Sequence, residues 1–172
     1  MKELKVDLFN SKKERVATSI ELSKFNIFIG NDFDNIRKII RNSKREESTY
    51  GYEDFGSASC ISKHKDIVYK FIKYYYNKNK IAVIHTDSQF VLYAFNNLIF
   101  NYIVKDKMPA DLRDEMTCKD IMIDPNDIRI YQVEDGIVTR IQNKDGLIEH
   151  NCFDSEMNII MNDFYKMINY YE

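Results

Sequence analysis

The chain has little cysteine and no long apolar run. Its 172 residues contain three cysteines, Cys60, Cys118 and Cys152. An odd number at wide spacing argues against a disulfide scaffold and for a reduced, intracellular protein. No window approaches the ~18 apolar residues of a membrane span, and charges interrupt residues 2–7, where a signal peptide would begin. We therefore expect a cytoplasmic protein without a membrane partner.

The net charge is also small, and tryptophan is absent. The formal net charge is −2 with 30% charged residues, so no global attraction to nucleic acid or membrane is expected. A hydrophobic content of 44% and the absence of repeats or linkers predict one domain over residues 1–172. The lack of Trp beside abundant Ile, Lys, Asn and Tyr is typical of an AT-rich genome, such as that of a low-GC bacterium or its phage.

Hydrophobic patterning predicts an α/β fold with a three-layer core and a mixed sheet. Alternating apolar and charged residues over 4–8 and a second apolar stretch over 16–22 predict N-terminal antiparallel strands. The apolar segments 25–29 and 80–84 are typical of buried central strands, and we expect them to be neighbours. Helices are expected over residues 62–77, 88–104 and 108–120, the last opened by Pro109.

A late β-hairpin and a C-terminal helix complete the expected fold. Strands over 127–133 and 137–141 flank Asp135-Gly136, a pair that suits a type I′ turn. Asp154 is expected to cap the final helix. Its apolar side is expected to face the core through Met157, Ile160, Met161, Phe164, Met167 and Ile168.

The segment after residues 25–29 has the layout of a phosphate-binding loop without its chemistry. An apolar strand, Gly30, a polar stretch and a helix follow one another as in the Walker A pattern G-x-x-x-x-G-K-[ST]. On that pattern Gly30 holds the first glycine position and Asn35 the second, while Ile36 replaces the lysine and Arg37 the hydroxyl residue. The groups that neutralise phosphate charge and hold magnesium are therefore missing.

Two aspartates in this stretch also act against nucleotide binding. Asp32 and Asp34 put carboxylates where phosphate oxygens would lie, which repels an anion. We expect residues 31–35 to form a tight loop in which Asp32 or Asp34 caps a helix that ends near residue 42. Nucleotide binding could survive in one way, if the guanidinium of Arg37 itself reached a phosphate.

A second segment adds to the likeness. Residues 80–88 predict a strand with a polar tip, and a helix follows. This arrangement resembles the "Thr-His-Ser" segment of ABC-type ATPase heads of the SMC, RecF and OLD kind. Asp87 stands where the switch histidine would be, and Ser88 matches the serine. Residues 61–63, 124–131 and 146–154 resemble further parts in the same order. The resemblance implies a degenerate, miniaturised ATPase head without functional Walker A, signature or switch-histidine residues.

Glu53-Asp54 is the acidic pair that would stand for a Walker B motif. The preceding residues 48–52 are barely hydrophobic, so a solvated loop is the better interpretation. Even a true remnant would need a nucleotide to bridge to its magnesium ion. No cofactor is therefore expected.

Two pairs of residues are weak candidates for zinc. They are Cys60 with His64, and His150 with Cys152. Structural zinc needs four ligands in paired short spacings, whereas these pairs lie far apart in the sequence. We expect no metal site.

His85, Asp87 and Ser88 suggest a nucleophile constellation. No glycine elbow presents Ser88, however. The simpler interpretation is that Asp87 or Ser88 caps the following helix. No catalytic residue is assigned.

Basic residues beside tyrosines are candidates for a binding surface. They are Lys70, Lys73, Tyr74, Tyr75, Tyr76, Lys78 and Lys80, together with Arg37, Lys38, Arg41, Lys44 and Arg45. Such faces bind single-stranded nucleic acid, and Tyr and Arg are also enriched at protein interfaces. Solvated helix ends carry the same residues, which is the simpler interpretation.

Three interpretations of the function of this chain remain. The favoured one is an inactive ATPase-like domain that acts as a protein-interaction or regulatory module, with a full-length ATPase or a phage or host complex as partner. The alternatives are a weak nucleotide-binding relative and a nucleic-acid-associated accessory domain. The first is favoured because the Walker lysine, hydroxyl and second glycine, the switch histidine and the signature region are all absent together, which leaves no route to phosphoryl transfer.

Overall fold

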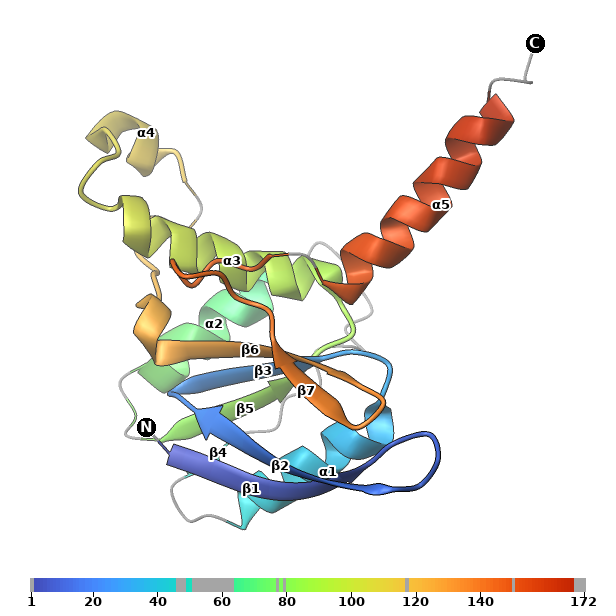
Figure 1. The fold of residues 1–172 in the computed structure, drawn as a ribbon. Helices are drawn as coiled ribbons and strands as arrows, with labels where there is room; N and C mark the ends of the chain where they lie inside the picture. Colours follow the sequence, from blue (N-terminus) through green and yellow to red (C-terminus); the bar gives the residue numbers. More distant parts are fainter. Residues whose placement is uncertain are drawn as a thin grey trace.

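The computed structural model describes residues 2–45, 49–50, 64–76, 78, 80–116, 118–149 and 151–168. Figure 1 shows the order of its elements. They are β1 (Lys2–Phe9), β2 (Arg15–Leu22), β3 (Phe25–Ile29), α1 (Phe33–Lys44), β4 (Thr49–Tyr50), α2 (His64–Tyr76), β5 (Ile81–His85), α3 (Gln89–Val104), α4 (Ala110–Asp114), the 3-10 helix η3 (Pro125–Asp127), β6 (Ile128–Glu134), β7 (Ile137–Arg140) and α5 (Cys152–Ile168).

The central sheet is mixed and has the strand order β4-β5-β3-β6-β7. β3 pairs in parallel with both β5 and β6, and Phe28 lies opposite His85. β4 pairs in parallel with β5 at the edge, in a stretch where the sequence indicated a loop, and β7 pairs antiparallel with β6. β1 and β2 form a separate antiparallel pair. The expected α/β fold and the central pairing of the two apolar strands are confirmed.

Two hydrophobic clusters cover opposite faces of this sheet. Phe25, Ile27 and Ile29 belong to the cluster with α2 and α3, whereas Phe28 belongs to the cluster with β1, β2 and α1. Alternate side chains of a strand point to opposite faces, and both faces are covered, so every residue of β3 is buried. Figure 1 shows the resulting three layers, with α2 and α3 on one side and α1 with β1 and β2 on the other.

The expected helix over 108–120 is much shorter. α4 covers only Ala110–Asp114, with Pro109 in the capping position. Beyond it, the Asn101 side-chain amide donates to the carbonyls of Cys118 and Ile121 at 2.8 and 2.9 Å. These long-range bonds hold the chain in turns, which local helix propensity does not reveal.

The C-terminal helix differs most from the expectation. Asn151 caps α5, because its Oδ1 accepts from the backbone N–H groups of Phe153 and Asp154 at 3.0 and 3.4 Å. Asp154 therefore lies inside the first turn and is not the cap. α5 projects away from the body (Figure 1), and Met157 and Ile160 are 42% and 61% exposed. The expectation that its apolar side faces the core is wrong for these residues, since periodicity reports an apolar stripe but not what covers it.

Candidate functional site

The loop after β3 is short and closed. Gly30, Asn31 and Asp32 connect β3 to α1, which begins at Phe33, before the position of the second Walker glycine. Asp32 caps the helix, because its Oδ1 accepts from the Asn35 N–H at 3.4 Å and its carbonyl accepts from the Ile36 N–H at 3.0 Å. The expected tight, helix-capping loop is therefore what the structure contains.

Gly30 is required by its contact with β6. Its φ is +122°, and an added Cβ would lie 2.3 Å from the carbonyl oxygen of Val133. No side chain fits there, because β6 runs directly beside the end of β3. Backbone packing thus explains this glycine without a phosphate.

The side chain of Asn35, at the second Walker glycine position, is held in place by hydrogen bonds. Its Oδ1 accepts from the Phe9 N–H at 3.0 Å, and its Nδ2 donates to the Phe9 carbonyl at 2.6 Å and to Asp32 Oδ2 at 2.8 Å. The side chain is 5% exposed. It joins the N-terminus of α1 to the end of β1 and fills the space of a wide loop.

Three turns meet at this edge of the sheet. Asp32 Oδ2 also accepts from the Gly136 N–H at 2.9 Å, and Asp135 accepts from the N–H of Ser11. Asp135 and Gly136 both have positive φ, 47° and 76°, as a type I′ turn requires. The sequence interpretation treated Asp32 as a helix cap that repels phosphate and missed its bond to the Gly136 N–H. The Asp-Gly pair, like residues 10–13, was a local signal of a turn here.

The three turns surround a cavity of about 630 Å³. Its lining residues are Phe9, Asn10, Ser11, Asn31, Asp32, Asp34, Asn35, Lys38, Glu134 and Asp135. Four of them are carboxylates and one, Lys38, is a cation, whose Nζ lies 3.9 Å from the centroid of the Phe9 ring. The described lining is thus strongly acidic, which disfavours a phosphate group.

The residues in the Walker lysine and hydroxyl positions are directed elsewhere. Ile36 is 1% exposed and packs in the cluster with β1 and β2. Arg37 is exposed and is absent from the described lining of the cavity. The structure therefore does not bring Arg37 together with the loop carboxylates.

The tip of β5 lies beside β3, as expected, but its side chains do not form a constellation with the loop. His85 is buried, with its ring edge-on to Phe33 at 5.7 Å between centroids. Ser88 caps α3 through its Oγ, which accepts from the Val91 N–H at 3.5 Å, so the capping interpretation is confirmed. Asp87 is exposed and does not belong to the described lining of the acidic cavity.

The basic and tyrosine residues do not share one surface. Those of α1 lie in the layer with β1 and β2, and those of α2 lie on the opposite face of the sheet. Tyr75 and Tyr76 pack against Phe71 and Phe25 at 4.5 and 6.4 Å between ring centroids, so they belong to the core. Tyr74 is 59% exposed with Lys78 over its ring. A continuous nucleic-acid surface is therefore not formed by these residues.

Several candidates fall outside the described residues. They are Glu53, Asp54, Cys60, His150 and the side chain of His64. Cys152 is half-buried, and burial raises the pKa of its thiol. Within the described ranges, no three histidine, cysteine or carboxylate side chains gather in a way that would hold a metal ion.

No model of a known protein family matches the chain, and a search of curated proteins finds no match. None of the helices in the described part of the chain has the length and apolar character needed to cross a membrane.

Proposed function

We propose that this chain is a catalytically inactive ATPase-like domain that acts by binding a protein partner, such as a full-length ATPase or a phage or host complex. The observation that carries the proposal is the closed loop after β3. Asp32 and Asn35 bond to each other, to Phe9 and to Gly136 in the space where a phosphate would bind. A nucleotide would have to break these bonds and enter an acidic cavity.

The same edge has features of a protein-binding surface. The carboxyl ends of parallel strands are where open α/β sheets place their ligands. Here the Phe9 ring lines the acidic cavity, and Phe33 begins α1 directly after Asp32; the two residues are 45% and 44% exposed. Half-exposed aromatic rings are typical of protein interfaces. A basic and apolar segment of a partner fits this surface better than a nucleotide does.

The loss of nucleotide binding is tested by thermal unfolding with and without Mg-ATP. A ligand at a hundred times its dissociation constant stabilises a protein by about 2.7 kcal/mol, which is roughly 5–10 °C in Tm for a domain of this size. We expect no shift and no hydrolysis above background. Steady ATP turnover that disappears in Arg37→Ala would overturn the proposal and identify an altered enzyme.

The partner surface is tested by affinity purification from the native cells. The full chain is compared with a Phe33→Ala/Asp34→Lys variant. Arg41→Ala, which replaces an exposed residue on the same helix, is the control. We expect a co-purifying protein to be lost from the first variant and kept by the second. The same proteins recovered with all three chains would show that this edge does not bind them.

A further inference from the structure

The outer side of α3 is an apolar surface. This helix has apolar residues on every side, a composition typical of helices covered all round. Its inner side packs in the core, with Leu92, Phe95 and Ile99 fully buried. On the outer side, Phe90, Tyr93 and Phe100 are 44%, 40% and 49% exposed. Their spacing of three and seven residues places them along one line of the helix.

A groove continues this surface at the C-terminal end of α3. It has a volume of about 440 Å³ and lies between α3 and the segment around α4. Phe100, Met108 and Met116 contribute to its lining. Flexible methionines beside an aromatic ring suit an apolar side chain inserted from outside.

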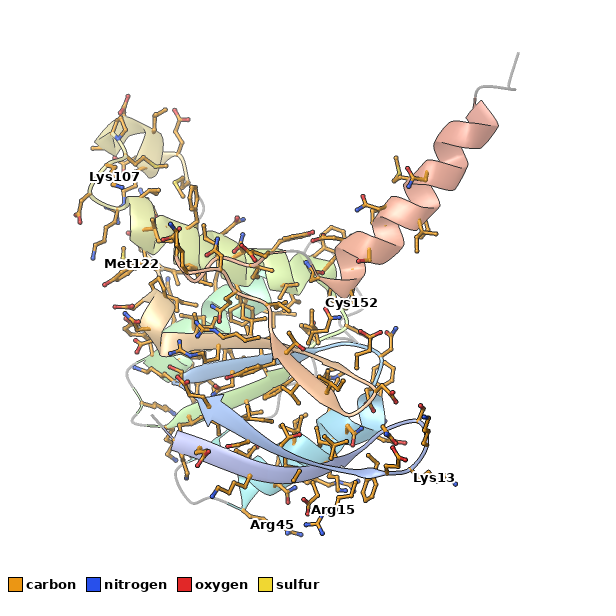
Figure 2. All side chains as sticks on the ribbon, viewed as in Figure 1. Lys13, Arg15, Arg45, Lys107, Met122 and Cys152 are labelled. Atoms are coloured by element: carbon orange, nitrogen blue, oxygen red, sulfur yellow. The ribbon has the colours of Figure 1, made fainter. Side chains whose placement is uncertain are left out.

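α5 has an apolar stripe that its own chain leaves exposed. Helical periodicity places Met157 and Ile160 on one side of the helix. These two residues are 42% and 61% exposed. Figure 2 shows α5 extending outward from Cys152, beyond the rest of the molecule.

Hydrogen bonds fix the direction of α5 at its first turn. Asp154 accepts from the Tyr93 hydroxyl and from Asn151 Nδ2, the latter at 2.7 Å. The Cys152 N–H donates to Gln132 Oε1 at 2.9 Å. The helix therefore starts beside the N-terminal end of α3 and points away from it. Its apolar stripe and the outer side of α3 do not cover each other within one chain.

We propose that two copies associate about a two-fold axis, with α5 of each packed along the outer side of α3 of the other. Each copy then supplies one projecting helix and one receiving surface, so the contact closes on itself. α5 and α3 have 17 and 16 residues, so both are about 25 Å long. An apolar side chain of α5 enters the groove beside Phe100.

The available area fits this arrangement. Aromatic side chains bury ~150–250 Å² each, and three aromatic residues on α3 have close to half of their surface exposed. Each copy buries its α3 surface and its α5 stripe once, and both count toward the ~800 Å² per partner of a stable interface. A coiled coil of two α5 helices alone would be weaker, because 17 residues fall short of the three to four heptads such pairs usually need.

The dimer does not depend on the proposed loss of ATPase function. α3 lies on the opposite face of the sheet from α1, which follows the degenerate loop. Nucleotide assays and measurements of mass therefore report on the two proposals separately.

The first test measures the mass of the full chain by sedimentation at several concentrations. Two adjacent isoleucines on α5 make a matched pair, since Ile159 and Ile160 are 57% and 61% exposed but lie on different sides of the helix. We expect wild type and Ile159→Asp to be dimers, and Ile160→Asp to dissociate with a dissociation constant raised ~100-fold or more. A monomeric wild type, or equal effects of the two substitutions, would overturn the proposal.

The second test is complementation between two variants. Phe100→Asp should be monomeric, like Ile160→Asp, and Phe90→Asp is a second choice on the same side should the first fail to fold. A mixture of Phe100→Asp and Ile160→Asp should form heterodimers, because the first has an intact α5 and the second an intact α3. An interface made only of two α5 helices would not be restored in this mixture. The absence of heterodimers would overturn the proposed exchange of α5.

Discussion

Both polar atoms of the Asn35 side chain bond to the backbone of a single residue, Phe9. The amide oxygen accepts from the Phe9 N–H at 3.0 Å and the amide nitrogen donates to the Phe9 carbonyl at 2.6 Å. The side chain thus takes the place of a neighbouring strand at the end of β1. The position of a Walker glycine is used here to hold α1 against the N-terminal strands.

Replacing Asn35 by alanine should destabilise the protein by about 2–4 kcal/mol. The substitution leaves the Phe9 N–H and carbonyl without their partner and removes one of the hydrogen bonds to Asp32 Oδ2. An unsatisfied polar group that is not exposed to water costs ~1–3 kcal/mol. Urea unfolding gives the change in free energy. Arg37→Ala, an exposed control on the same helix, should stay within ~0.5 kcal/mol of wild type. Equal effects would show that the amide contacts do not stabilise the fold.

Gly30→Ala should cost at least ~3 kcal/mol. The new Cβ would lie 2.3 Å from the Val133 carbonyl oxygen. In addition, alanine is strained at a φ of +122°, which glycine adopts freely. Either β6 moves away from β3 or the variant fails to fold. Circular dichroism during thermal unfolding measures the effect. A variant as stable as wild type would mean that the contact with β6 is not tight.

Arg129→Ala should cost more than Arg15→Ala. Arg129 has a side chain only 9% exposed, is paired with Glu21 at 3.1 Å, and donates to the carbonyls of Pro125 and Ile128. Its loss should destabilise by about 2–3 kcal/mol. The ion pair of Arg15 with Asp7 is exposed, 69% and 41%, and should contribute little to stability. Unfolding at low and high salt completes the comparison, since only the Arg15 contribution should fall with salt.

Tyr93→Phe should lower stability at neutral pH but not at very high pH. The hydrogen bond to Asp154 and burial raise the pKa of Tyr93 to about 12 in the folded protein, against about 10 in an unfolded chain. The contribution is therefore fully present below pH ~10 and is lost as the pH rises through ~12. Because the ring is 40% exposed, we expect only about 1 kcal/mol at pH 7.

The difference in unfolding free energy between wild type and Tyr93→Phe, measured from pH 7 to pH 12, checks this. Dilute protein is used so that association does not contribute. A difference that stays constant across this range would contradict the assigned hydrogen bond.

Local features of the sequence predicted much of the fold. Alternation over residues 2–9, the continuous apolar run of β3 and the Asp-Gly turn all report on the conformation of a few neighbouring residues. The neighbouring positions of β3 and β5 were predicted as well, because both are apolar runs with polar residues after their carboxyl ends. The cap at Ser88 follows from its own side chain.

The candidate site could be predicted only in part. The absence of a lysine and a hydroxyl after Gly30 was readable from the sequence, and it gave the hypothesis of an inactive loop. The partners of Asp32 and Asn35 were not readable, because Phe9 and Gly136 are distant in the chain and contribute backbone atoms, which all residues share.

The sequence by itself determined most of the strands and the longer helices and which of their sides are apolar, because both depend on the spacing of neighbouring residues, whereas β4 and the shortness of α4 were not foreseen. Only the tertiary structure decided what each apolar side and polar group meets. It placed Val133 against Gly30, bound Asn35 to Phe9, and directed α5 away from the core although its apolar stripe matches a core helix. The physical reason is that burying a side chain lowers the free energy equally well against its own chain or another, and periodicity does not distinguish the two.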